Sequence, residues 1–201
     1  DSIDFFTVSH HGTLLLQESK DWKHMVSVQV AVCKSISSYQ TKFTVGIGVL
    51  KKDALEEAVY SMAGMGASAI IPIVTSKSSE PPSPREITRL ETAIIAACEQ
   101  AKNVRLPMLL PAQPLETYLS SPATLRCFFT ATGASMPNLI TALQATPATI
   151  QVLIGAEGGF TQAEEAAIAH AGWQEYALTP TILRAVDAAR VVTGLIRSLV
   201  H

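Results

Sequence analysis

The chain of 201 residues has few charged side chains and few cysteines. Asp, Glu, Lys and Arg together make up 16% of it, whereas apolar residues reach 48%. An average globular protein has about 25% charged residues, and a disordered chain needs still more charge and less apolar content, so disorder is excluded. The net charge of −2 argues against a strongly basic nucleic-acid arm or a polybasic membrane anchor. We therefore expect a compact, unusually apolar domain with part of its surface buried against another chain.

Further classes are excluded by the cysteines, the apolar runs and the N-terminal residues. Cys33, Cys98 and Cys127 are too few and too scattered for a disulfide framework, and no cysteine–histidine cluster predicts a metal site. The longest apolar runs fall far short of the ~18 residues that a membrane-spanning helix needs. The first residues carry neither a basic leader nor a signal-peptide core. We expect a cytoplasmic protein without a membrane or metal partner, or a mitochondrial or plastid one if a leader is missing and the source is eukaryotic.

Hydropathy patterns divide the chain into two parts. Valines at every second position from Val26 to Val32 predict strands within residues 13–34, and a polar linker follows at residues 35–42. Beyond it, the patterns predict strands at residues 44–50, 68–74, 108–110, 124–130, 150–154 and 176–178. They also predict helices that begin near Asp53 (as N-cap), Pro84, Pro114, Pro137, Thr161 and Val186. This alternation implies an α/β fold with a parallel sheet covered on both faces, so we divide the chain at residues 1–42 and 43–201.

A glycine-rich segment, Ile154–Phe160 (IGAEGGF), lies between a predicted buried strand and a capped helix. Ligands of parallel sheets bind beyond the carboxyl ends of the strands, and glycines let the backbone approach a ligand closely. Spacing alone leaves two interpretations open, a ligand-binding loop and a tight turn without a ligand. The segment matches no dinucleotide or Walker A pattern, and the carboxylate of Glu157 would repel a phosphate. A neutral or cationic small molecule fits it better.

Two other segments carry polar residues at helix ends. Leu178–Asp187 joins the last predicted strand to the last helix, with Arg184 and Asp187 bracketing the start of that helix. In the simpler interpretation, Asp187 only complements the helix N-terminus and Arg184 is solvated. The segment Cys98–Pro107 ends a helix among polar groups, which from spacing alone indicates an ordinary helix end.

Taken together, these segments resemble the RsmE family, the small-subunit ribosomal RNA uridine-N3 methyltransferases of the SPOUT superfamily. Their order and spacing agree with the family from about Thr44 to the end of the chain. The family patterns are I-G-P-E-G-G-F/L-S-x-x-E, R-[IV]-L-R-T-E-T-A and A-A-C-E-Q-C-G-R-N-R-V-P. The matching stretches are residues 154–164 with Ala156 in place of proline, residues 181–184 with 187–188, and residues 96–100 with Arg105 and Pro107.

The resemblance implies a SPOUT-type parallel sheet with a C-terminal deep trefoil knot. A PUA-like β-barrel precedes this domain in the family, so residues 1–42 would be its remnant. The implied activity is the methylation of N3 of a uridine in small-subunit ribosomal RNA. S-adenosylmethionine is the implied methyl donor, ribosomal RNA the partner, and a homodimer the assembly.

The family motifs also imply roles for individual residues. For the donor, the implied contacts are Thr130, Ala131, Gly133, Ile154, Gly155, Glu157, Gly158, Gly159, Leu178, Pro180, Ile182 and Leu183. For RNA, they are Lys77, Glu99, Gln100 and Arg105. Arg184 would stabilise negative charge developing on the uridine, and Asp187 would assist removal of the N3 proton. The donor carries a sulfonium cation and no phosphate, so Glu157 is compatible with it.

The sequence departs from the family at positions expected to touch the substrate. Ala185-Val186-Asp187 replaces Thr-Glu-Thr, Lys102-Asn103 replaces Gly-Arg, and Ser61 and Gly64 replace lysine and glutamate. An asparagine cannot reproduce the bidentate phosphate contact of an arginine. Two hypotheses follow. We favour an active methyltransferase with altered substrate contacts; the alternative is a catalytically weak or inactive SPOUT protein that acts as an RNA-binding ribosome-assembly factor.

Overall fold

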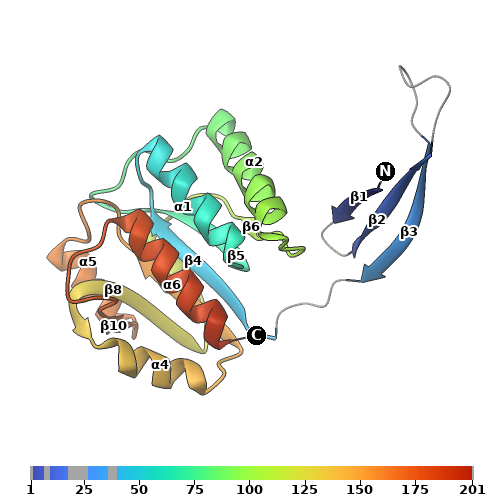
Figure 1. The fold of residues 1–201 in the computed structure, drawn as a ribbon. Helices are drawn as coiled ribbons and strands as arrows, with labels where there is room; N and C mark the ends of the chain where they lie inside the picture. The colour runs from blue at the N-terminus through green and yellow to red at the C-terminus, as the bar shows by residue number, and fades with distance from the viewer. Residues whose placement is uncertain (1, 7–9, 18–26, 36–39, 201) are drawn as a thin grey trace.

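The computed structural model describes residues 2–6, 10–17, 27–35 and 40–200, and it contains two sheets (Figure 1). The first is antiparallel, in the order β1 (Ser2–Phe6), β2 (His10–Gln17) and β3 (Ser27–Ser35). The strands predicted within residues 13–34 are therefore confirmed where the chain is described. Val26 and residues 36–39 of the predicted linker lie outside the described residues. No described strand of this sheet pairs with the second sheet.

The second sheet is parallel throughout its described pairs and runs in the order β10-β8-β9-β4-β5-β6, with β7 paired to β5. Its strands are β4 (Lys42–Gly48), β5 (Ala69–Val74), β6 (Met108–Leu109), β7 (Gln113–Pro114), β8 (Leu125–Ala134), β9 (Thr149–Ile154) and β10 (Gln174–Tyr176). The predicted α/β class with a parallel sheet is confirmed. Because β4 and β9 lie in the middle, the loops that follow them meet at one end of the sheet.

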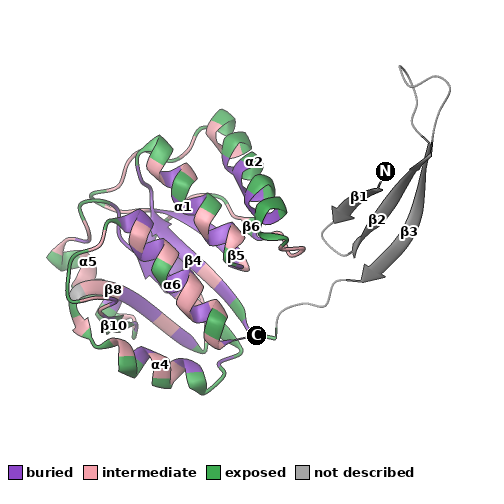
Figure 2. Cartoon of the chain, viewed as in Figure 1, coloured by how far each residue is buried: buried purple, intermediate pink, exposed green. Residues whose placement is uncertain are grey.

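Helices cover both faces of this sheet and create two apolar cores (Figure 2). They are α1 (Lys52–Gly64), α2 (Pro84–Ala101), α3 (Leu115–Leu119), α4 (Met136–Gln144), α5 (Gln162–His170) and α6 (Ala185–Leu199). Successive strand residues alternate between the cores: Ile70 belongs to the core that includes residues of α1, α2, α4 and α6, whereas Ile71 belongs to the core that includes residues of α3 and α5. No helix in the described part of the chain has the length and apolarity needed to cross a membrane.

Side-chain caps fix the starts of two helices. Ser83 and Glu86 form a capping box at α2, and Thr161 and Glu164 form the box predicted at α5. The predicted cap of α1 is wrong, because Lys51 is the N-cap residue and Asp53 lies inside the first turn. The helix starts earlier since the Lys51 N–H already has an acceptor, the carboxylate of Glu157 at 3.2 Å. Asp53 instead complements the positive end of the helix.

Tyr118 on α3 forms hydrogen bonds with both central strands of the sheet, β4 and β9. It is fully buried, and its hydroxyl accepts from the Gly46 N–H at 3.1 Å and donates to the Val152 carbonyl at 2.9 Å. Burial raises the pKa of this phenol far above its ordinary value, so it stays a neutral donor. A Cβ at Gly46 would lie 2.5 Å from the Tyr118 ring, so glycine is needed there. One side chain thus connects the two central strands of the sheet, β4 and β9.

We expect Tyr118→Phe to lower the free energy of unfolding by about 1–3 kcal/mol, because two buried backbone groups lose a partner. Urea unfolding monitored by circular dichroism measures this change. Tyr60→Phe is the matched control, since Tyr60 is 41% exposed and its hydroxyl removal should cost less than about 0.5 kcal/mol. Equal unfolding midpoints for Tyr118→Phe and the wild type would contradict the role assigned to this hydroxyl.

Candidate functional site

A cavity of about 310 Å³ lies where the loops after β9 and β10 meet the C-terminal half of β8. Several residues implied as donor contacts line it: Thr130, Ile154, Gly155, Glu157, Gly158, Gly159, Leu178, Ile182 and Leu183. Of the other implied donor contacts, Gly133 and Pro180 are not in the lining, and the side chain of Ala131 is not among those that the structure describes. Two of the three motif segments therefore meet at one cavity, although they are separated in sequence by a whole helix and strand.

Gly133 does not line the cavity; it allows two strands to approach each other closely. A Cβ at this position would lie 2.5 Å from the backbone carbon of Tyr176, so glycine permits the close passage of β8 against β10. The pairing is irregular here: Phe128 opposes Glu175, whereas Ala134 opposes the next residue, Tyr176. The extra residues of β8 bend away from the ladder. Their bend brings part of β8 to the cavity.

The glycine loop, residues 155–160, turns sharply from β9 towards α5. Gly159 has a φ of +63°, a left-handed conformation that glycine adopts without strain, and its N–H donates to the Ala156 carbonyl at 2.9 Å. A Cβ at Gly48 would lie 2.5 Å from the Ala156 nitrogen. The end of β4 and the loop after β9 are therefore in direct backbone contact. This contact places the loop at the mouth of the cavity.

The charges around the cavity are acidic. Its lining includes the carboxylates of Glu157 and Glu165, together with threonine hydroxyls and apolar side chains, and the described lining contains no lysine, arginine or histidine. Such a cavity repels phosphate and favours a neutral or cationic ligand. Sequence reasoning missed Glu165, although its position in the first turn of the capped helix after the glycine loop could have suggested it.

The residues implied as RNA contacts lie at two opposite ends of the sheet. Lys77, in the loop after β5, donates from Nζ to the carbonyls of Gly158 at 2.9 Å and Phe160 at 3.0 Å. Glu99, Gln100 and Arg105 instead flank the end of α2, shortly before β6, whose first residue pairs with the first residue of β5. Within one chain, these three residues are therefore at the amino end of the strands, away from the cavity.

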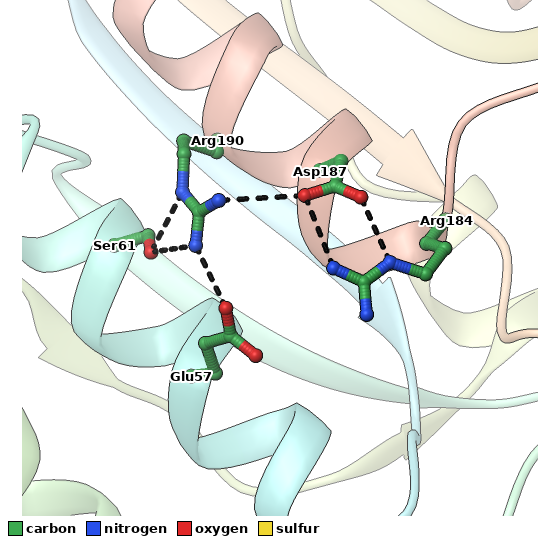
Figure 3. A network of polar contacts seen from close by, with 5 residues as sticks. All are labelled: Glu57, Ser61, Arg184, Asp187 and Arg190. Atoms are coloured by element: carbon green, nitrogen blue, oxygen red, sulfur yellow. Dashed lines mark hydrogen bonds and ion pairs between the residues drawn. The ribbon is translucent and has the colours of Figure 1, made fainter.

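Arg184 and Asp187 belong to a chain of ion pairs that joins the start of α6 to α1 (Figure 3). The Arg184 Nε donates to Asp187 at 2.9 Å, and Arg190 contacts the same carboxylate at 3.3 Å and Glu57 at 2.9 Å. Ser61, which stands where the family has lysine, accepts from Arg190 at 3.3 Å. The hydrogen bond from Arg184 and the two positive charges hold the pKa of Asp187 below its ordinary value. The carboxylate is therefore a poor proton acceptor while these pairs persist.

The side chain of Asn103 likewise forms hydrogen bonds within the protein. The Asn103 amide donates to the Ala63 carbonyl at 3.1 Å, and its oxygen accepts from the Arg105 N–H at 3.1 Å. These contacts connect the end of α2 to the end of α1. Asn103 thus stabilises the helix end at a position where the resemblance implies an arginine. No group of three potential metal ligands occurs among the described residues.

Comparisons with known proteins agree with the fold and identify the family. Residues 37–197 match the family model described as an RNA methyltransferase domain. The chain is 30% identical over 204 residues to ribosomal RNA small subunit methyltransferase E of Synechocystis sp. and 24% identical over 190 residues to the protein of that name from Rickettsia conorii. The alignments cover 98% and 94% of this chain but 66% and 77% of the relatives.

Solved structures share the fold at lower identity. A Legionella pneumophila methyltransferase in complex with S-adenosylmethionine superposes with a TM-score of 0.86 at 20% identity, over 98% of this chain and 83% of the other. A ribosomal RNA small subunit methyltransferase E from Neisseria gonorrhoeae, also bound to S-adenosylmethionine, gives a TM-score of 0.87 at 20% identity, over 99% and 83%. The similarity extends over both sheets of the present chain.

We expect Asp187→Asn to make the free energy of unfolding depend less on pH in the acid range. Because folding lowers the pKa of Asp187 below its ordinary value of 3.8, its ionised form stabilises the native state above that pH. That contribution is lost as the pH falls through the lower native pKa. Urea unfolding at a series of pH values should therefore show the variant less stable than the wild type at neutral pH, with the two curves converging in acid.

The control for this experiment is Glu91→Gln, the same carboxylate-to-amide change at an exposed position within α2. Its stability curve should run nearly parallel to that of the wild type at all pH values. A parallel curve for Asp187→Asn as well would contradict the contribution of the ion pairs around α6.

Proposed function

The chain belongs to the RNA methyltransferase domain family, and we propose that it methylates small-subunit ribosomal RNA with S-adenosylmethionine as donor. The resemblance to the RsmE family is confirmed by the family match and the relatives. The observation that carries the proposal is the acidic cavity that the two C-terminal motif segments build together. The two segments are separated in sequence, and because they line the same cavity, both would contribute to binding the same ligand.

The cavity fits the donor chemically. S-adenosylmethionine supplies an activated methyl group on a sulfonium cation and carries no phosphate. Glu157 and Glu165 would attract that cation, whereas they would repel a nucleotide phosphate. Phe129, Ile154 and Leu178 offer apolar surface for the remainder of the donor. The volume of about 310 Å³ lies within the range of small-molecule sites.

For the substrate, the proposal follows the resemblance: N3 of a uridine accepts the methyl group. Arg184 lies between two cavity-lining residues, Leu183 and Ala185, and its side chain is 73% exposed. A guanidinium in this place would stabilise negative charge on the uridine as its N3 proton leaves. Asp187 accepts from the Nε of Arg184 at 2.9 Å and from its Nη2 at 3.5 Å, which leaves Nη1 available to the base. For Asp187 to take the proton itself, its ion pairs would first have to break.

A homodimer would bring the separated RNA residues together. Glu99, Gln100 and Arg105 lie at the opposite end of the sheet from the cavity, so a second copy is one way to place both groups on one RNA. Exposed apolar side chains on three outer helices, Tyr60, Ile95 and Val191, would give such a dimer an interface. The trefoil knot, the PUA-like character of residues 1–42 and a cytoplasmic location are further parts of the proposal and follow from the resemblance.

One observation favours the alternative, a ribosome-assembly factor without strong catalysis. Ser61 and Asn103, which replace charged residues of the family, bond to partners within the protein. Neither substitution touches the cavity, so donor binding would survive under both hypotheses while RNA contacts change.

We expect S-adenosylmethionine to bind with measurable heat in calorimetry and to raise the melting temperature by mass action. ATP, which shares the adenosine but carries phosphates, should neither bind comparably nor stabilise, because Glu157 and Glu165 line the cavity. The absence of any heat or stabilisation by S-adenosylmethionine would overturn the proposed donor. Equal stabilisation by ATP would overturn the electrostatic argument.

Ribosomal RNA from cells lacking the protein should lack one N3-methyluridine, which mass spectrometry of nucleosides detects. The wild-type gene should restore this modification, whereas Arg184→Ala should slow methylation by about 10²–10³-fold while it retains donor binding. Arg184→Lys, which keeps the charge, serves as the matched variant and should be impaired less. Unchanged N3-methyluridine in the deletion, with donor binding intact, would favour the assembly-factor alternative.

A further inference from the structure

Lys77 lies across the glycine loop, although it belongs to the loop after β5. Its Nζ donates to the carbonyls of Gly158 at 2.9 Å and Phe160 at 3.0 Å, on either side of the left-handed Gly159. Its aliphatic stem covers Gly158, where an added Cβ would lie 3.1 Å from the Lys77 Cδ and 3.2 Å from its Cβ. Lys77 therefore contacts the loop through both its charge and its methylene groups.

Two other contacts hold the flanks of the same loop. The Lys51 N–H donates to Glu157 Oε1 at 3.2 Å, and the Ser76 N–H donates to Glu164 Oε1 at 2.7 Å. Neither of these bonds involves the carbonyls of Gly158 and Phe160, which accept from Lys77. The loops after β4 and β5 thus act together on the loop after β9, and Lys77 holds its middle.

We propose that Lys77 is a positioning residue that keeps the glycine loop in its donor-binding shape, and that this is its role in place of an RNA contact. The inference rests on the proposed function, because it assumes that the donor binds at this loop. Consecutive glycines lose more conformational freedom on ordering than other residues, and a ligand that must order them binds more weakly. Charge-assisted hydrogen bonds to two carbonyls order the loop beforehand.

The geometry disfavours an RNA role for the same side chain. A lysine ammonium has three N–H donors, and two of them are directed to main-chain oxygens of the loop. A phosphate would have to compete with both carbonyls for this ammonium and would release the loop as it did so. RNA binding through Lys77 would then oppose donor binding at the adjoining cavity.

The test compares Lys77→Met with Lys77→Arg and with Lys42→Met. Methionine keeps the apolar cover of Gly158 but removes the donors, whereas arginine can still donate to the two carbonyls. Lys42 is exposed at the amino end of β4, so its substitution makes the same charge change far from the loop. Calorimetry with S-adenosylhomocysteine gives the affinity, and hydrogen exchange of the amides in residues 155–161 of the ligand-free protein gives the order of the loop.

For Lys77→Met, we expect affinity for S-adenosylhomocysteine to fall about tenfold and the loop amides to exchange faster. Lys77→Arg should stay within about threefold of the wild type, and Lys42→Met should match it. A role in stability alone would lower the melting temperature of the ligand-free protein without changing affinity. Unchanged affinity or unchanged exchange in Lys77→Met would overturn the proposal.

Binding of a small-subunit ribosomal RNA fragment at several salt concentrations separates the two roles of Lys77. Under the proposal, Lys77→Met leaves the slope of log K against log salt unchanged. A phosphate contact would instead reduce the slope by about one, and that result would overturn the proposal. If wild-type protein bound neither S-adenosylhomocysteine nor S-adenosylmethionine, the proposed function itself would fail, which is distinct from normal binding by Lys77→Met.

Discussion

The backbone contact between Gly48 and Ala156 is the constraint on which the rest of the site depends. The end of β4 and the loop after β9 approach so closely that a Cβ at residue 48 would lie 2.5 Å from the Ala156 nitrogen. Only this approach brings the Lys51 N–H within reach of the Glu157 carboxylate, which in turn sets where α1 begins. One missing side chain therefore determines a loop conformation, a helix start and the position of an acidic group at the cavity.

The two ends of the parallel sheet have different properties. Between them, Tyr118 connects the two central strands. Beyond its hydrogen bonds to Gly46 and Val152, the carboxyl ends of the strands carry the glycine loop and the cavity. At the amino ends, the helices close with ordinary contacts such as that of Asn103 with Ala63. The proposed ligand site thus lies at one end of the sheet, next to the strands that Tyr118 connects.

The sequence predicted the parts of this architecture that depend on local chemistry. Strand and helix order followed from periodicity, the cap at Thr161 from its spacing to Glu164, and the cavity-lining segment Ile154–Gly159 from its glycines and its resemblance to a known motif. Apart from the omission of Glu165, the main errors and omissions involve contacts between distant segments. Asp53 has the spacing of a cap, yet Glu157, about a hundred residues away, satisfies Lys51 instead. The partners of Lys77 and the passage of Gly133 past Tyr176 depend on register, which no local pattern contains.

The scarcity of charge gives these distant contacts their importance. With 15 lysines and arginines in 201 residues, the chain uses several basic side chains for its own structure. Lys77 binds loop carbonyls, Arg190 joins α6 to α1, and Arg197 donates to the Gly66 carbonyl at 2.8 Å while it stacks over Phe43. Each of these cations stabilises the domain that carries the site and contributes correspondingly less to general attraction for phosphate. Under the proposed function, recognition of RNA would therefore depend on a few well-placed groups, such as Arg184 beside the cavity, more than on the overall electrostatic field of the protein.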